Sequence, residues 1–526
     1  MSITGLASIG GNNVQGNGSA FLAFDPSKRE SMAPAFYMVD AQQIDTACRL
    51  AQAAFDPFRS TTDEQRAVFL ETIAQQIMAL GDELIVRAMA ESGLPRARLE
   101  GERGRTAGQL KLFADLLREG SWRDVRIDSA LPERQPPRPD LRMRMIGLGP
   151  VAVFAASNFP LAFSVAGGDT ASALAAGCPV VLKAHSAHPG TSELMARAIV
   201  RAIQVCELPA GVFSLLTGTG NGIGQELVRH PAIQAVGFTG SRSGGMALMA
   251  VAAARAQPIP VYAEMSSINP VYLLPQALAN RTTEIAQGFA ASLTLGAGQF
   301  CTNPGLVLAL AGADFERFAQ HAAQALSGAA CATMLTPGIA SSYQSGVQRL
   351  AAQTEVTSLT PVANAVKEEG KGGPALFLTS GAAFLAQAAL HDEIFGPASL
   401  LVACRDLNQM LEITEKLEGQ LTATLQLDDA DLPMAARLLP VLERRVGRIL
   451  ANGFPTGVEV ATAMVHGGPF PSTSDGRSTS VGTGAINRFL RPVSYQNLPQ
   501  ALLPDALRDL NPLGIWRRRD GTLGKE

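Results

Sequence analysis

One cysteine of this chain lies in a loop suited to close approach of a substrate. Cys301 is surrounded by small and flexible residues, with Gly296, Gly298 and Gly305 nearby and Pro304 three positions later. Because glycine adopts backbone conformations that other residues avoid, such a loop can bring a sulfur close to a substrate carbon. We therefore interpret Cys301 as a candidate nucleophile. The alternative is a buried structural thiol, since free cysteines are among the most buried residue types.

Other side chains supply the groups that a thiol attacking a carbonyl carbon needs. Asn158 follows the apolar run 149–156, and its amide can donate to an oxyanion. Glu264 ends the β-rich run 259–263, where a carboxylate partly withdrawn from water can act as a general base. Glu393 lies in a loop bounded by turn residues. Gly- and Pro-bounded segments of this kind are typical of strand ends and loops.

The order of these residues resembles the aldehyde dehydrogenase superfamily over nearly the whole chain. The segments that carry the resemblance are Asn158-Phe-Pro, Val180-Val-Leu-Lys183, Phe238-Thr-Gly-Ser241 with Gly245, Glu264 with Asn269-Pro270, Gly298-Gln-Phe-Cys301 and Glu393-Ile-Phe-Gly-Pro397. Any one of them is weak evidence, because short motifs occur by chance. Their common order identifies the chain as a member of the superfamily.

The resemblance implies a role for each of these residues. The Cys301 thiolate attacks an aldehyde carbon, and the Asn158 amide, together with the Cys301 backbone N–H, stabilises the oxyanion. Hydride leaves for a nicotinamide, and Glu264 activates the water that hydrolyses the remaining thioester. Relatives that pass the acyl group to coenzyme A lack this glutamate, so we expect a free acid as product. Glu393 is expected to hold the nicotinamide ribose, with Phe395 near the ring; the alternative is a solvated carboxylate and a core aromatic.

Two positions bear on the choice of cofactor. By the resemblance, Lys183 points its ammonium at the adenosine ribose of a nicotinamide dinucleotide. Many NAD-preferring relatives have a glutamate where this chain has Ser186. A carboxylate repels a 2′-phosphate, whereas a hydroxyl can donate to it and Lys183 can pair with its charge. We therefore expect NADP to be used at least as well as NAD.

Glycine-rich turns lie near the same expected site. The segment 218–224 has Ile223 where a strict dinucleotide pattern requires glycine, so we interpret it as a strand-to-helix turn near the cofactor. The segment 240–245 follows an apolar strand and precedes a helix, whose amino end can receive pyrophosphate. Gly240, Ser241 and Gly245 are accordingly assigned to the cofactor site, with Ser241 as a hydroxyl donor.

Composition limits the other classes of function. The chain has 526 residues, 47% of them hydrophobic and 17% charged, and a formal net charge of −3. This charge gives no reason to expect nucleic acid or an anionic membrane as partner. Six cysteines without paired spacing indicate a reducing compartment, and no apolar run approaches the ~18 residues that span a bilayer, so we expect a cytoplasmic protein. Dispersed histidines without HExxH or CxxC predict no metal site.

Alternating strand-like and helical segments predict an α/β fold. We expect a Rossmann-type cofactor domain in residues 1–125 and 146–265, followed by a mixed α/β catalytic domain in 266–479. The resemblance makes 126–145 and 480–498 a β-arm for oligomerisation, with a C-terminal tail in 499–526. It also implies a homo-oligomer, either a dimer or a tetramer. The active site is expected in the cleft between the two large domains.

The segment 263–270 departs from the common family pattern. Ser266, Ser267 and Ile268 stand where most members have two glycines and a lysine. With the segments 489–497 and 511–516, these residues resemble the members that oxidise α-ketoglutarate semialdehyde (2,5-dioxopentanoate) to 2-oxoglutarate. Bacterial NADP-dependent fatty-aldehyde dehydrogenases share parts of the pattern and remain the alternative.

These two small-molecule substrates require different pockets. A dioxopentanoate carries a carboxylate and needs a cation or several donors, whereas a long alkyl aldehyde needs an apolar channel. The predicted helix 100–118 lines the entrance in relatives, and we expect Arg105 or Arg103 to meet a substrate carboxylate. The alternative is an exposed helix face paired with Glu100 or Glu102. The expected apolar walls are Phe163, Phe300 and Phe454.

Functions of another class remain open at this point. The chain can instead be a catalytically silent binding protein, or a thiol esterase that uses Cys301 without a cofactor. A catalytically silent protein does not need the asparagine, the cysteine and the two glutamates in the order found here. An esterase has no need of Lys183 or the 240–245 loop. Formation of NADPH with a small aldehyde discriminates among the three.

Overall fold

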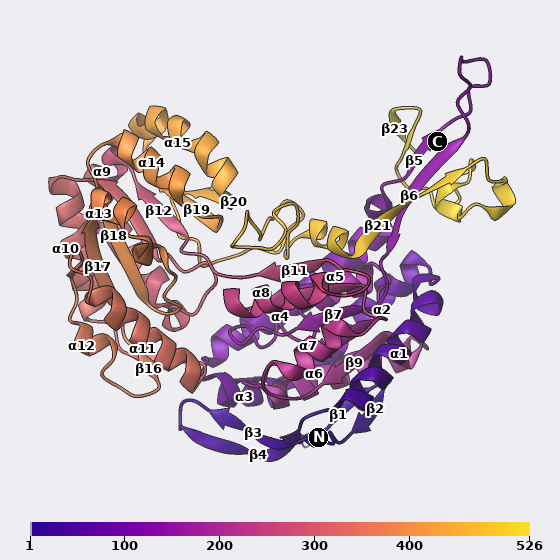
Figure 1. Cartoon of the computed structure of the whole chain (residues 1–526), viewed down its shortest axis with the longest axis horizontal. Coiled ribbons are helices and arrows are strands. Elements are labelled where there is room, and N and C mark those ends of the chain that lie inside the picture. Colours follow the sequence, from indigo (N-terminus) through magenta and orange to yellow (C-terminus); the bar gives the residue numbers. More distant parts are fainter. Residues whose placement is uncertain (1–2, 526) are drawn as a thin grey trace.

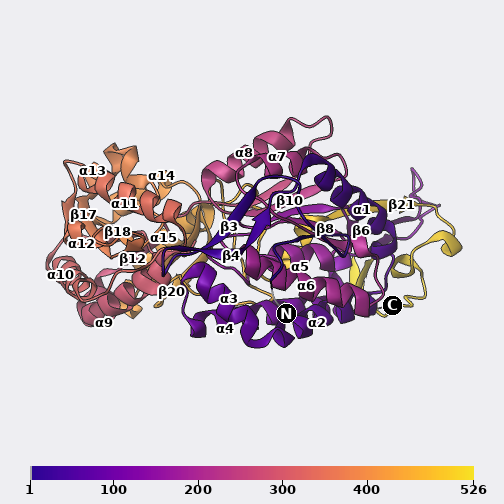
Figure 2. The ribbon, with the colours of Figure 1, turned by 90° about the horizontal axis from the view of Figure 1, so that it is seen from below.

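The computed structural model describes residues 3–525 of the chain, which form two α/β lobes and a projecting arm (Figure 1). The first lobe contains most of the N-terminal half, and the second lobe contains residues from about 270 to 451. Figure 2 shows the second lobe and the arm at opposite ends of the molecule. The predicted α/β fold is confirmed.

The first lobe is built on a seven-stranded sheet with the order β11-β10-β7-β8-β9-β1-β2. The strands from β11 to β9 are parallel, so their carboxyl ends meet at one edge. Phe154, Lys183 and Glu264 all end strands at this edge. The bounds are β11 (Val261–Glu264), β10 (Ala235–Thr239), β7 (Val151–Phe154), β8 (Val180–Lys183), β9 (Phe213–Leu216), β1 (Ala7–Ile9) and β2 (Asn12–Val14).

Helices cover both faces of this sheet, as parallel strands require. Alternate residues of the strands enter different cores: Val151 and Val153 pack with α2, α4 and α6, whereas Ala152 and Phe154 pack with α1, α7 and α8. The side chain of Ser241 caps α8. The helices are α1 (Ala41–Arg59), α2 (Asp63–Ala79), α3 (Gly81–Ser92), α4 (Arg96–Glu119), α5 (Gly168–Ala175), α6 (Pro189–Val205), α7 (Gly222–Arg229) and α8 (Arg242–Ala253). A hairpin of β3 (Ala20–Asp25) and β4 (Glu30–Tyr37) precedes them.

The second lobe also has a seven-stranded sheet, with the order β15-β17-β18-β13-β12-β19-β20. All its strands except β15 run parallel. They are β15 (Thr357–Ser358), β17 (Ala375–Ser380), β18 (Ala398–Cys404), β13 (Leu306–Leu310), β12 (Pro270–Leu273), β19 (Gln420–Gln426) and β20 (Val446–Ala451). The helices are α9 (Pro275–Thr294), α10 (Ala313–Ser327), α11 (Pro337–Ala351), α12 (Val362–Ala365), α13 (Gly381–Ala386), α14 (Leu407–Lys416) and α15 (Leu432–Arg445). A small ladder pairs β14 (Ala332–Thr333) with β16 (Lys371–Gly372).

The arm is a five-stranded sheet with the order β21-β6-β5-β22-β23, which extends away from the first lobe (Figure 1). Its strands are β21 (Leu490–Gln496), β6 (Leu141–Gly147), β5 (Arg126–Asp128), β22 (Arg517–Arg519) and β23 (Thr522–Gly524). The segment predicted as a separate tail therefore adds two strands to the sheet of the predicted arm. The short helix at Thr483–Phe489 packs into the first lobe, with Ile486 and Phe489 in its core.

None of the helices within residues 3–525 combines the length and the apolar character needed to cross a bilayer.

Candidate active site

The loop that carries Cys301 connects α9 to β13 and is held from several sides. The Asn269 side chain donates 2.9 Å hydrogen bonds to the carbonyl oxygens of Cys301 and Asn303. Gly298 has φ +64°, and a Cβ added there would lie 2.4 Å from the carbonyl carbon of Gly396. Glycine is thus required by both the backbone conformation and the close approach of the 393–397 loop. These contacts determine where the sulfur lies.

The structure brings the predicted nucleophile and base together, with a histidine beside both. Nε2 of His466 lies 3.4 Å from Cys301 Sγ and 3.0 Å from Glu264 Oε1. The histidine ring nitrogen, the cysteine sulfur and a carboxylate oxygen of these three side chains all lie within 4.8 Å of one another. Ser480 Oγ donates to the other oxygen of Glu264, at 3.0 Å. Glu264 comes from the end of β11 and His466 from the segment after β20, so the cluster joins the first lobe to the chain that returns from the second.

Asn158, the predicted oxyanion donor, is buried beside the same loop. Its side-chain Nδ2 donates a 3.1 Å hydrogen bond to the carbonyl oxygen of Gln299. The backbone carbonyl of Asn158 accepts a 3.1 Å hydrogen bond from Arg98. A primary amide has two N–H groups, so one remains for an oxygen on the substrate. Asn158 and Cys301 line one cavity.

The electrostatics of the cluster favour a protonated thiol next to an ionised carboxylate. Burial, followed by the charge of Glu264, holds the pKa of the Cys301 thiol well above its ordinary value. Burial alone would raise the pKa of Glu264, but the charge and hydrogen bond of His466, with hydrogen bonds from Cys301 and Ser480, bring that pKa below its ordinary value. Glu264 is therefore placed to accept a proton.

A cavity of about 700 Å³ extends from Cys301 over the carboxyl edge of the first-lobe sheet. Its lining includes, from the cofactor residues predicted above, Lys183, Gly240, Ser241, Glu393 and Phe395. The N-terminal ends of α7 and α8 border it through Asn221 and Ser243, and such helix ends favour phosphate. Loss of hydration lowers the pKa of the Lys183 ammonium to about 8. The size, the cation and the helix ends fit a nicotinamide dinucleotide.

Two predicted cofactor residues have a different environment. Gly245 lets α8 approach the end of β11, because a Cβ there would lie 3.3 Å from Ala263 Cβ and 2.7 Å from Met265 Sδ, and it does not line the cavity. Ser186 is half-buried in the turn after β8, next to His185, which does line the cavity. The assignment of Ser186 stays a prediction.

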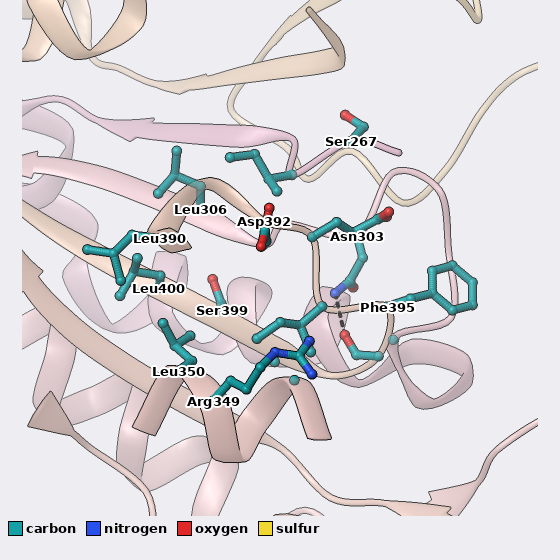
Figure 3. A pocket seen from close by; sticks show the side chains of 18 of the residues that line it. Ser267, Asn303, Leu306, Arg349, Leu350, Leu390, Asp392, Phe395, Ser399 and Leu400 are labelled. Atoms are coloured by element: carbon teal, nitrogen blue, oxygen red, sulfur yellow. Dashed lines mark hydrogen bonds between the residues drawn. The ribbon is translucent and has the colours of Figure 1, made fainter. Parts of the chain in front are cut away.

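The loop with Glu393 and Phe395 separates the large cavity from a second one of about 150 Å³. Figure 3 shows this smaller cavity, with Phe395 at its edge and the hydrogen bond from Asn303 Nδ2 to the Gly396 carbonyl, 3.0 Å long. Burial, which outweighs a hydrogen bond from the Ser267 backbone, raises the pKa of Glu393 to about 8. The loop thus presents to the cofactor cavity a carboxyl group that is easily protonated.

Arg105 and Arg103 point to different surroundings. Arg105 stacks over the ring of Phe163, 5.4 Å from its centroid, and donates to the Val458 carbonyl at 2.7 Å. It is close enough to Cys301 and Glu264 to interact with their charges. Its Nε and Nη2 are buried and have no hydrogen-bond partner within the described residues. Arg103 instead donates to the carbonyl of Gly81, the first residue of α3.

The three phenylalanines predicted as apolar walls of the substrate pocket also differ in their surroundings. Phe159 contacts both Phe163 and Phe300, with ring centroids 5.2 and 5.4 Å away, and Arg98 lies over Phe159 and Phe300. Phe163 also faces His466, at 6.0 Å. Phe454 packs against Phe289 at the edge of a second-lobe core. Arg103 and Phe454 thus have structural contacts of their own.

Sequence reasoning missed His466, Arg98 and Ser480. For His466 a signal exists, because Gly467, Gly468 and Pro469 follow it in the same way that small residues surround Cys301. For the other two residues no local pattern marks a function.

Comparisons with known proteins agree with this geometry. Residues 14–490 match the model of the aldehyde dehydrogenase family. The chain is 59% identical to alpha-ketoglutaric semialdehyde dehydrogenase 2 of Azospirillum brasilense, over 99% of both chains. It is 49% identical to the alpha-ketoglutaric semialdehyde dehydrogenase of Acinetobacter baylyi, over 98% of both.

Solved structures show the same fold at lower identity. An aldehyde dehydrogenase from Pseudomonas aeruginosa superposes with a TM-score of 0.82 at 20% identity, covering 94% of this chain and 97% of that one. One from Pseudomonas syringae, solved with NAD⁺ and octanal, gives a TM-score of 0.80 at 20% identity, covering 93% and 96%. With the family model and the two close relatives, these findings lead to one conclusion: the chain belongs to the aldehyde dehydrogenase family and is an NAD(P)-dependent enzyme.

Proposed function

We propose that this enzyme oxidises 2,5-dioxopentanoate (α-ketoglutarate semialdehyde) to 2-oxoglutarate. The observation that carries the proposal is Arg105, a guanidinium with unpaired buried N–H groups beside Cys301. Buried donors without partners are costly, so such a site favours a ligand that supplies acceptors. A carboxylate accepts two parallel hydrogen bonds from arginine. The close similarity to two dehydrogenases named for this semialdehyde supports the same substrate.

The first half of the reaction uses Cys301, Glu264 and Asn158. Glu264 takes the thiol proton, and the sulfur attacks the aldehyde carbon to form a thiohemiacetal. The free N–H of Asn158 and the backbone N–H of Cys301 stabilise its oxyanion. A bound nicotinamide dinucleotide supplies the hydride acceptor for this intermediate.

The second half hydrolyses the thioester that remains on Cys301. Glu264, once its first proton has passed to solvent, removes a proton from water, which attacks the thioester carbon. The C–S bond breaks, the acid leaves, and the sulfur recovers a proton. The hydrogen bond from Ser480 keeps one oxygen of Glu264 oriented during both steps.

NADP is used at least as well as NAD in this proposal. Lys183 at the end of β8 can pair with a 2′-phosphate, and Ser186 can donate to it. A glutamate in place of Ser186 would repel the phosphate.

Turnover with two aldehydes tests the choice of substrate. We compare kcat/KM for 2,5-dioxopentanoate and for decanal in the wild type and in Arg105→Leu, with Arg103→Leu as the matched control on the same helix. Arg105→Leu is expected to lower kcat/KM for the dioxo acid at least about tenfold and to leave decanal nearly unchanged, since a hydrogen bond to a charged group contributes about 1.5–3 kcal/mol. Equal losses for both aldehydes would contradict the role of Arg105.

The alternative substrate, a fatty aldehyde, is favoured by one observation. Phe159, Phe163 and Phe300 form an aromatic group near the catalytic cysteine, which suits an alkyl chain. Higher kcat/KM for decanal than for the dioxo acid in the wild type would support this alternative.

We also propose that the arm joins copies of this chain into a homo-oligomer. β21 is an edge strand, and unpaired edges of this kind pair readily with another chain. All six cysteines are unpaired, which supports a reducing compartment such as the cytoplasm. Light scattering on the purified enzyme gives the oligomeric state.

A further inference from the structure

His466 lies where a single nitrogen faces both the nucleophile and the base. Its Nε2 is 3.4 Å from Cys301 Sγ and 3.0 Å from Glu264 Oε1, and the side chain is 1% exposed. The proposed reaction as described above uses no histidine.

The position of His466 is held through its backbone and through one face of its ring. Its backbone N–H donates to Thr479 Oγ1 at 2.9 Å, and its carbonyl accepts from the Ser480 N–H at 2.8 Å. Ser480 Oγ in turn donates to Glu264. One face of the ring meets Phe163. The imidazole is thus aimed at the sulfur and the carboxylate together.

The hydrogen bonds also indicate where the imidazole carries its hydrogen. Nδ1 is buried and has no hydrogen-bond partner within the described residues. A hydrogen on Nδ1 would be a buried donor without an acceptor, whereas a hydrogen on Nε2 meets the Glu264 carboxylate. The arrangement therefore places a hydrogen on Nε2, where it meets the Glu264 carboxylate.

We propose that His466 is a fourth catalytic residue, whose Nε2–H donates to Glu264 in the resting enzyme and to the Cys301 thiolate during attack. The S–H bond breaks, its proton passes to Glu264, and the electron pair stays on sulfur. His466 keeps its own hydrogen throughout and only changes the acceptor of its hydrogen bond. The thiolate thereby receives a donor at the moment when the carboxylate has lost its charge. This inference rests on the proposed function for the identity of the nucleophile.

Several charged groups besides His466 face the sulfur, and they remain in place in His466 variants. They are Glu264 from β11, Glu393 from the loop before β18, Arg98 and Arg105 from α4, and Arg448 from β20. A change in thiol reactivity on replacing His466 alone can therefore be assigned to that residue.

Alkylation of Cys301 by iodoacetamide tests the inference without aldehyde or cofactor. The rate is followed from pH 6 to 10 in the wild type, His466→Leu, His466→Gln and the control His321→Leu, whose histidine is bonded to Thr283 on α9. Loss of the donor in His466→Leu is expected to slow alkylation at pH 7.5 at least about tenfold and to move its midpoint to higher pH. His466→Gln, which keeps an N–H at similar reach, should recover to within about threefold of the wild-type rate.

Two results would overturn the inference. One is an alkylation profile of folded His466→Leu that matches the wild type. The other is an equal loss in His466→Leu and His466→Gln, which would mean that a donor is not what the site needs. If His466→Leu does not fold, His466→Phe replaces it, because an aromatic ring can still pack on Phe163. Failure of the proposed function is seen separately, as a wild-type enzyme that oxidises no aldehyde whatever the alkylation series shows.

Discussion

The side-chain amide of Asn158 donates a 3.1 Å hydrogen bond to the carbonyl oxygen of Gln299, two residues before the reactive sulfur. This bond orients the amide, so that its second N–H remains for an oxygen on the carbon that Cys301 attacks. The oxyanion donor and the nucleophile are thus positioned by the same loop.

Replacing Asn158 by alanine should therefore affect the chemical step more than binding. We expect kcat to fall about 10²–10³-fold, as for other oxyanion donors, with little change in the Kd for NADP. Steady-state kinetics and cofactor titration measure the two quantities. A variant that loses cofactor affinity but keeps kcat would contradict this role.

Ser186→Glu tests the choice between the two cofactors. The new carboxylate should repel the 2′-phosphate, so the KM for NADP is expected to rise at least about tenfold while the KM for NAD stays level or falls. Ser186→Ala is the matched control and should affect NADP only slightly. An unchanged KM for NADP in Ser186→Glu would remove Ser186 from the account.

Lys183 makes NADP affinity depend on pH. Burial lowers the pKa of its ammonium to about 8 in the free enzyme, and pairing with a 2′-phosphate should raise that pKa. Affinity is then highest below pH 8 and falls as the pH rises from about 8 toward 9.5, by up to tenfold per unit. Titrations of the wild type and Lys183→Met measure it; the variant should bind more weakly and without this dependence. A wild-type Kd that is constant across this range would contradict the pairing.

Glu393 should lower the stability of the cofactor-free enzyme at alkaline pH. Its pKa is raised from 4.5 to about 8, mainly by burial, so the folded state prefers the protonated form. This contribution is fully present below pH 4.5 and is lost as the pH rises through 8. Glu393→Gln cannot ionise at this position. The difference between its Tm and that of the wild type should therefore grow by about 3 °C, in favour of the variant, from pH 5 to pH 8.5. The exposed Glu284→Gln is the control, and the same pH dependence in all three proteins would refute this effect.

Much of the site can be predicted from the sequence because its residues end strands or lie in glycine-rich loops. Glu264 and Lys183 both close apolar runs, and parallel strands bring such ends to one edge of a sheet. Gly296 and Gly298, which precede Cys301, have positive φ values that glycine adopts more easily than other residues. For these residues the local pattern contains the structural reason for their position.

The remaining features depend on contacts between distant segments. His466 is 165 residues from Cys301 and 202 from Glu264, so no local spacing relates the three. Arg103 and Arg105 are two positions apart on α4 and therefore point about 200° around the helix from each other. Only one of them can face the cysteine, and the phase of the helix relative to the site is set by packing that the sequence does not display.

The C-terminal strands illustrate the same limit. In the sequence, Arg517–Arg519 is a short run of positive charge. In the structure it forms β22 and pairs with β5, which lies almost 400 residues earlier. Arg517 is buried and donates to the backbone carbonyl of Asp509 at 3.1 Å. A charge run alone predicts exposure, so the pairing could not be anticipated.

Trapping the acyl group on Cys301 tests the central claim most directly. Glu264→Gln is mixed with NADP and excess 2,5-dioxopentanoate, and the formation of NADPH is followed together with the mass of the peptide that contains Cys301. Without its base the variant should hydrolyse the thioester about 10²–10⁴-fold more slowly. Attack by Cys301 continues in this variant, because the glutamine carries no charge that raises the pKa of the thiol and water can take its proton. The account predicts a burst of about one NADPH per active site and an acyl adduct on Cys301. No burst, or an adduct on another residue, would contradict it.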